Sequence, residues 1–162
     1  MEASLSAKSM ESMVLGFYSV ISLDEIGFCG GYLVLNPMGR PQEFHCTLPI
    51  QPQRAQQILY GESLLAHLYA DHLGPPLVAK AKLKADLVLI NQSESLQLVD
   101  RLSVPVAYLR KSDDGKLQYR AANTDHREFV RQAIQGLNAI DWVEPFQRIQ
   151  LAIEEAHAVR VR

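Results

Sequence analysis

Cysteine is scarce in this chain. Its 162 residues include only two cysteines, Cys29 and Cys46, and they do not form a Cys-x-x-Cys pair. Two cysteines at this spacing cannot build the disulfide framework that supports many small secreted domains. The scarcity argues against the disulfide-rich class, and reduced thiols in a cytoplasmic protein are the simplest interpretation.

A surplus of charge of one sign is also missing. The chain carries 16 basic and 18 acidic side chains, for a formal net charge of −2. No global field draws it toward nucleic acid or an acidic membrane, so a nucleic-acid partner is only weakly supported and would need a local basic patch. Apolar runs such as residues 87–90 are too short to span a bilayer, which predicts no membrane partner.

Known catalytic and nucleotide-binding motifs are not found. The sequence has no Gly-x-Ser-x-Gly nucleophile elbow and no glycine-rich loop with the lysine and serine of a phosphate-binding turn. His45 and Cys46 are adjacent on a predicted strand and should point to opposite faces, which disfavours a zinc site. The Gly30-Gly31 pair indicates a bulge or a close backbone approach. No cofactor is predicted from these residues.

The apolar content, in contrast, is that of a folded domain. Hydrophobic residues make up 48% of the chain and charged residues 21%, so it can bury a core. We expect residues 1–12 to form a loose tail and residues 13–162 to form a single α/β domain. Apolar, β-branched and aromatic patterning predicts antiparallel strands first, then alternating helices and strands, then two C-terminal helices. The predicted strands cover 14–23, 32–35, 42–48, 87–90 and 104–109, with a hairpin from 113 into 117–121. The main helices cover 54–73, 126–137 and 142–157. Gly74-Pro75-Pro76 is the predicted stop of the first helix, and Asp141 is the predicted N-cap of the last.

This order of elements resembles that of the ribonuclease H-like class of fold. In that class, a β-meander is continued by α/β units into one mixed sheet, here of about five strands. The resemblance covers residues 14–110 and rests on the order of elements alone, so it carries little information about activity. The hairpin near Asp113 departs from the minimal pattern.

Glu62 is the most informative single residue. On a helical wheel for residues 54–73, it lies near the middle of an apolar stripe, flanked by Ile58, Leu65 and Tyr69. A buried carboxylate needs a cation, a metal or a hydrogen-bond donor, so a misplaced one is a candidate functional group. A structural role, with a lysine or arginine as partner or at the edge of a groove, is the more common alternative.

The resemblance also implies where a metal would bind. It suggests Asp24, Glu62 and Glu94 as catalytic residues, and Asp24, Glu62, Asn91 and Asp125 as ligands of Mg²⁺. Two-metal chemistry on phosphates needs several clustered carboxylates. Asn91 is neutral where an aspartate would be wanted, and Asp24 stands at the end of its strand.

Because no catalytic set is complete, we expect a non-catalytic domain that binds a protein or a ligand. Self-association into a small homo-oligomer is expected, since the terminal helices could supply an interface. The alternative is a ribonuclease H-like, metal-dependent nuclease or nucleic-acid processing domain, in intact or degenerate form. Only this alternative calls for a cofactor, which would be Mg²⁺.

Overall fold

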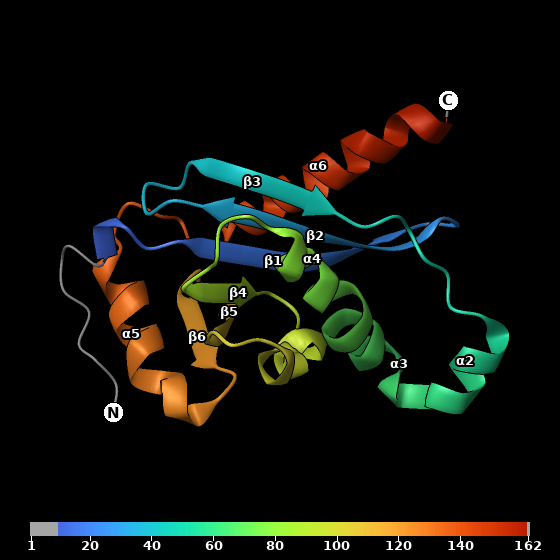
Figure 1. Cartoon of the computed structure of the whole chain (residues 1–162), viewed down its shortest axis with the longest axis horizontal. Coiled ribbons are helices and arrows are strands. Elements are labelled where there is room, and N and C mark those ends of the chain that lie inside the picture. The colour runs from blue at the N-terminus through green and yellow to red at the C-terminus, as the bar shows by residue number, and fades with distance from the viewer. Residues whose placement is uncertain (1–9, 162) are drawn as a thin grey trace.

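A six-stranded sheet forms the centre of the molecule. The computed structural model describes residues 10–161, with side chains described up to residue 158. The strands lie in the order β3-β2-β1-β4-β5-β6 (Figure 1). Their bounds are β1 Leu15–Leu23, β2 Gly27–Leu35, β3 Pro41–Cys46, β4 Leu87–Ile90, β5 Val106–Lys111 and β6 Leu117–Ala121.

Strand direction confirms the predicted fold class. β1, β2 and β3 form an antiparallel meander. β4 pairs with β1 in parallel, β5 pairs with β4 in parallel, and β6 returns antiparallel to β5. The fold is therefore α/β with the ribonuclease H-like order of elements. The sheet has six strands rather than about five, because the hairpin after Lys111 adds β6; Gly115 lies in its turn with a φ of 82° that suits glycine.

Helices cover both faces of the sheet. Helices α5 (Arg127–Gly136) and α6 (Glu144–Val161) pack on one face, where Phe17, Leu33 and Leu89 point. The other face, which carries Tyr18 and Val88, is covered by the helical segments between β3 and β5. Each face buries its own apolar cluster, so the sheet is the middle of three layers.

The predicted helix over residues 54–73 is interrupted, which corrects the expectation drawn from its apolar stripe. It consists of α2 (Arg54–Tyr60), the 3-10 turn η1 (Gly61–Ser63), α3 (Leu64–Ala66) and the π-helix η2 (His67–Leu73). Gly61 has a φ of 53° and ends the first segment. As a result Ile58 and Leu59 are 66% and 83% exposed. One helical wheel cannot describe this segment, because its register changes at Gly61 and again in η2.

The stop predicted at Gly74-Pro75-Pro76 is also wrong. The helical path continues through α4 (Gly74–Lys80), with proline at its first positions. Proline is tolerated there because the amides of the first turn lack intrahelical partners. After β4, the chain forms the 3-10 helix η3 (Ser93–Arg101), and the 3-10 turn η4 (Thr124–His126) leads into α5.

The two ends of the chain are described unequally. Of the tail predicted over residues 1–12, residues 1–9 lie outside the described part, whereas Met10 packs against the α5–α6 face of the core. The predicted C-terminal helices correspond to α5 and α6 as bounded above. No helix within residues 10–161 has the length and apolar character needed to cross a membrane.

Candidate ligand cleft

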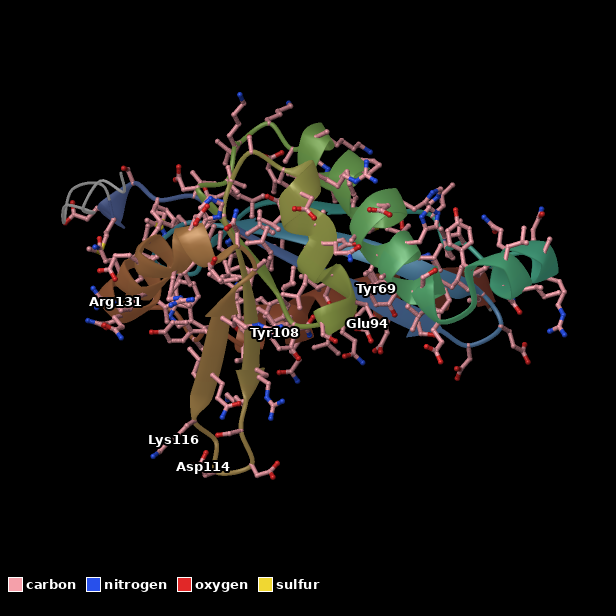
Figure 2. All side chains as sticks on the ribbon, turned by 90° about the horizontal axis from the view of Figure 1, so that it is seen from below. Tyr69, Glu94, Tyr108, Asp114, Lys116 and Arg131 are labelled. Atoms are coloured by element: carbon pink, nitrogen blue, oxygen red, sulfur yellow. The ribbon has the colours of Figure 1, made fainter. Side chains whose placement is uncertain are left out.

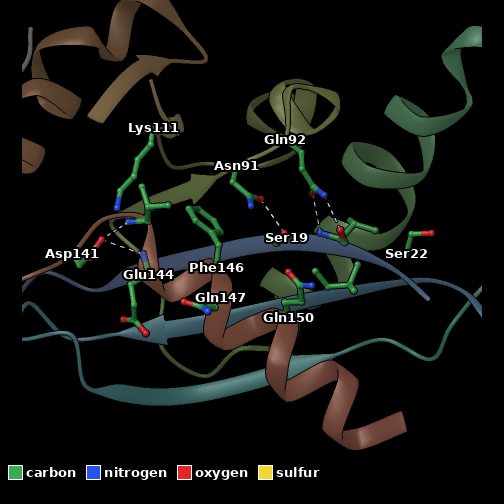
Figure 3. Close-up of a pocket in the computed structure, with 13 residues that line it drawn as sticks. Ser19, Ser22, Asn91, Gln92, Lys111, Asp141, Glu144, Phe146, Gln147 and Gln150 are labelled. Atoms are coloured by element: carbon green, nitrogen blue, oxygen red, sulfur yellow. Dashed lines mark hydrogen bonds between the residues drawn. The ribbon is translucent and has the colours of Figure 1, made fainter. Parts of the chain in front are cut away.

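The carboxyl ends of the parallel strands define a cleft. β1, β4 and β5 run in the same direction, so their ends meet at one edge of the sheet. The chain leaves β1 toward β2 on one side and leaves β4 toward β5 on the other, which opens a crevice between β1 and β4. Ligands of open α/β sheets bind at this kind of crossover point. A cavity of about 570 Å³ lies there (Figure 3), within the range of small-molecule sites.

Hydroxyl and amide groups line the sheet side of the cleft. Ser19 is only 1% exposed although it lies in the middle of β1, and its Oγ donates a 2.9 Å hydrogen bond to Oδ1 of Asn91, the first residue after β4. Gln92 follows, and its side chain bonds to both backbone groups of Val20, at 2.9 Å to the N–H and 2.7 Å to the C=O. A side-chain amide thus continues the β1–β4 pairing beyond the end of β4.

The opposite wall is the start of α6. Asp141 caps this helix, because its Oδ1 accepts hydrogen bonds from the backbone N–H groups of Val143 and Glu144 at 3.0 and 3.1 Å. These bonds lower the pKa of Asp141, and the positive charge of Lys111 lowers it further. The aspartate predicted from the sequence as an N-cap therefore performs that role.

Glu144, the second carboxylate of this wall, is also hydrogen-bonded within the protein. Its carboxylate accepts hydrogen bonds from Nε of Arg148 at 2.9 and 2.8 Å. Nη1 of Arg148 also donates to the carbonyl of Gly39 at 2.8 Å, which ties α6 to the loop between β2 and β3. Both carboxylates that line the cleft thus have partners within the protein.

Aromatic packing fixes the position of this wall. Phe146 of α6 meets Phe17 of β1 edge to face, with ring centroids 5.4 Å apart, and Trp142 lies 6.3 Å from the same phenylalanine. All three side chains are buried. Because these rings are closely packed, the polar residues on the next positions of α6 are held at a defined distance from β1.

The groups left to meet a ligand are mostly hydrogen-bond donors. Lys111 and Gln147 line the cavity, and among the described residues neither has a hydrogen bond or ion pair from its side chain. The amide nitrogen of Asn91 remains available because only its oxygen is used by Ser19. The side-chain nitrogen of Gln150 donates a hydrogen bond to Glu154, so its oxygen remains available as an acceptor. The arrangement suits a polar ligand with an anionic group.

The structure does not bring the predicted site residues together. Asp24 is exposed in the turn after β1, Glu62 is exposed in η1, and Asp125 is exposed in η4. Glu94 is half-buried on η3; burial raises the pKa of Tyr69, and the negative charge of Glu94 raises it further. Only Asn91 lines the cleft. The prediction that Glu62 lies within a buried apolar stripe is wrong, because the helix that would carry this stripe is interrupted at Gly61.

The cleft does not fit the metal that the fold class implies. Across residues 10–161, no group of three or more histidine, cysteine, aspartate or glutamate side chains is placed to hold a metal ion. Where the pairing of β1 with β4 ends, the two strands carry Ser19 and Asn91, which are hydrogen-bonded to each other. The hard cation Mg²⁺ needs carboxylate ligands, and Asp141 and Glu144 are already bonded to a helix end and to an arginine.

Most of the cleft residues were not singled out from the sequence as site residues. Ser19, Gln92, Lys111 and Gln147 come from four separate stretches of chain that the fold alone brings together. The available signal was Ser19, a polar residue inside the apolar run of residues 14–23. A polar residue at the centre of a buried strand needs a partner, and Asn91 supplies it.

Comparison with known proteins gives only distant similarity. No family model matches the chain, and no curated protein sequence matches it. Human ENDOV superposes with a TM-score of 0.38 at 16% identity, covering 74% of this chain and 54% of that one. Ciona intestinalis Endonuclease V in complex with a 24mer DNA superposes with a TM-score of 0.33 at 17% identity, covering 62% of this chain and 46% of that one. The catalytic domain of human Endonuclease V superposes with a TM-score of 0.35 at 17% identity, covering 78% of this chain and 55% of that one. The chain spans about half the length of these structures.

Proposed function

We propose that this protein is a ribonuclease H-like domain that binds a small ligand in the cleft at the carboxyl edge of its sheet. The observation that carries the proposal is the hydrogen bond between Ser19, in the middle of β1, and Asn91, the first residue after β4. Hydroxyl and amide groups recognise polar ligands without a metal ion, and binding at this edge is typical of α/β sheets.

The donor-rich lining suggests the class of ligand. Lys111 offers a positive charge, and Asn91 and Gln147 offer amide groups that suit hydroxyls or the edge of a heterocycle. A small, hydroxyl-rich anion such as a nucleoside monophosphate combines these features. The exposed face of Phe146 is small because it packs on Phe17, so affinity should come mainly from hydrogen bonds and charge.

An NMR titration locates the site. Adding adenosine monophosphate to ¹⁵N-labelled protein should shift the amide signals of residues 19–22, 91–92 and 143–147 together. Lys111→Met should weaken binding about tenfold or more, because a hydrogen bond to a charged group is lost. Adenosine without its phosphate should bind Lys111→Met and the unaltered protein equally.

The matched control is Lys80→Met, at an exposed lysine of α4 that does not line the cleft. It should leave the affinity for adenosine monophosphate unchanged. Shifts confined to other parts of the protein, or equal affinity in Lys111→Met, would show that the ligand does not bind in this cleft.

A metal-dependent nuclease is the second candidate. The strand order and directions favour it, since they are those of the ribonuclease H-like class. It requires that Asp141 or Glu144 leave its present partners to hold a metal. Self-association into a homo-oligomer stays a prediction of the sequence.

A further inference from the structure

The outer edge of β6 is a second feature that calls for a partner. Within residues 10–161, β6 is the last strand of the sheet and pairs only with β5. Figure 2 shows the β5–β6 hairpin extending away from the helices, with Asp114 and Lys116 near its tip. Among the strands that the structure describes, none pairs with the other side of β6 along its five residues.

The free side presents backbone donors and acceptors. The N–H of Ala122 donates to Val106, and the C=O of Lys116 accepts from Ser112, so both residues point toward β5. Backbone groups alternate in direction along an antiparallel strand. The N–H and C=O groups of Leu117, Tyr119 and Ala121 consequently point outward, and no hydrogen bond joins them to other backbone groups in residues 10–161.

The opposite edge of the sheet, in contrast, is protected. β3 begins with Pro41, which lacks a backbone donor. Further along β3, the carboxylate of Glu43 accepts hydrogen bonds from the backbone N–H groups of Lys82 and Leu83, at 2.9 and 2.7 Å. The segment after α4 is thereby held against β3. Such covering is how proteins prevent unwanted strand pairing. No hydrogen bond from the described part of the chain covers the outer edge of β6 in this way.

Two cavities flank β6, one on each face of the sheet. One, of about 340 Å³, is lined by Tyr108, Arg110, Gln118, Tyr119 and Arg120. The other, of about 310 Å³, lies between β6 and α5 and is lined by Tyr119, Arg120, Ala121, Thr124, Arg127, Val130 and Arg131. Side chains of an added strand alternate between the faces of a sheet, so successive residues would enter these two cavities.

The charge of both cavities is positive. Neither is lined by an acidic residue. Arg131 is neutralised by Glu128, but Arg120 lies over the ring of Tyr108 at 6.0 Å, and no salt bridge of Arg110 or Arg120 is found among residues 10–161. A second copy of this edge would bring arginines next to arginines, which is destabilising. An acidic segment is complementary.

We infer that β6 receives an extended, acidic segment of a partner protein as an additional strand of the sheet. Backbone hydrogen bonds to Leu117, Tyr119 and Ala121 supply the affinity, and the arginines on both faces select acidic side chains. This surface is separate from the cleft, so it does not depend on the proposed ligand.

Fluorescence anisotropy with a short labelled peptide that repeats two glutamates and two valines tests this inference, because an added strand of that sequence carries glutamate on both of its faces. The full chain should bind it, and should not bind the same peptide with lysine in place of glutamate. The backbone variant is Ala121→Pro, which removes one outward N–H and leaves the bonds to β5 in place. We expect affinity to fall at least about fivefold, the effect of losing one hydrogen bond.

Ala121→Val keeps the N–H, so it should lose less affinity than Ala121→Pro. The control is Lys80→Met, at an exposed lysine that lines neither cavity, and it should bind the peptide normally. Arg120→Glu is a second variant that leaves the backbone intact, and it should reduce binding of the acidic peptide. Equal binding of a peptide with a central proline would overturn strand addition, because attraction of charge would then suffice. Binding of a labelled oligothymidylate but not of the peptide would overturn it in favour of single-stranded nucleic acid.

Discussion

Two buried tyrosines on neighbouring strands differ in what their hydroxyls contact. The hydroxyl of Tyr18 donates a 2.6 Å hydrogen bond to the carbonyl of Tyr69, within the π-helix η2. The hydroxyl of Tyr32 is buried without a partner among the described residues, beside Gly16. Burial raises the pKa of both phenols. Comparing the same substitution at the two tyrosines therefore measures how much one buried hydrogen bond contributes to the free energy of unfolding.

Tyr18→Phe should lower the free energy of unfolding by about 1–2 kcal/mol, because the partner carbonyl is left in a buried site. Tyr32→Phe should leave stability unchanged or raise it slightly, because it removes a polar group that has no partner. Urea unfolding of both variants measures the difference. A larger loss in Tyr32→Phe than in Tyr18→Phe would contradict this description of the core.

The positions of individual site residues were the hardest feature to predict from the sequence. Glu62 appeared buried because an uninterrupted helix was assumed, but the exposed fraction of Leu59, 83%, shows that α2 has no buried face. Asp141 was assigned correctly as a cap because capping depends on local sequence. Ser19 and Asn91 are 72 positions apart, and only the pairing of β1 with β4 brings them together.

At the scale of elements, close contact between α6 and β2 positions the cleft wall. A Cβ atom on Gly31 would lie 2.5 Å from Cγ2 of Ile149 and 2.9 Å from Cδ1 of Ile153, so the helix lies directly on the strand. On the other face, Gly30 approaches Leu77. The sequence indicated a bulge or a close backbone approach for this glycine pair, and the close approach is what the structure shows.

Gly31→Ala should destabilise the protein by about 1–3 kcal/mol, the usual cost of overpacking a core, and should displace α6. Because α6 carries Gln147 and Gln150, ligand binding in the cleft should weaken as well. Chemical denaturation measures the first effect and the NMR titration the second. Ile149→Ala should partly rescue Gly31→Ala in a double-mutant cycle. Purely additive losses would argue against direct contact.

Elements were predicted well where apolar and turn patterns were local. The meander and the hairpin with Gly115 were identified because alternating residues and turn residues encode them directly. The helical region after β3 was not predicted correctly. Its π-helix η2 and its continuation into α4 through Pro75 depend on packing against η3 and the sheet.

At the scale of the whole molecule, strand order determines where the cleft lies. The parallel strands β1, β4 and β5 end at one edge, and the chain diverges there. The order of elements could be predicted from the sequence, and the position of a binding site follows from it. The chemistry of the site could not be predicted from the sequence, because it depends on which side chains point into the cavity from β1, the end of β4 and α6.

Calorimetric titration of adenosine monophosphate into the protein, once in EDTA and once in excess Mg²⁺, distinguishes direct binding from binding through a metal ion. Because Lys111, Asn91 and Gln147 bind the ligand directly in this account, the affinity should be the same in both solutions and should fall in Lys111→Met. Binding that appears only with Mg²⁺ and persists in Lys111→Met would contradict the account and favour the metal-dependent nuclease.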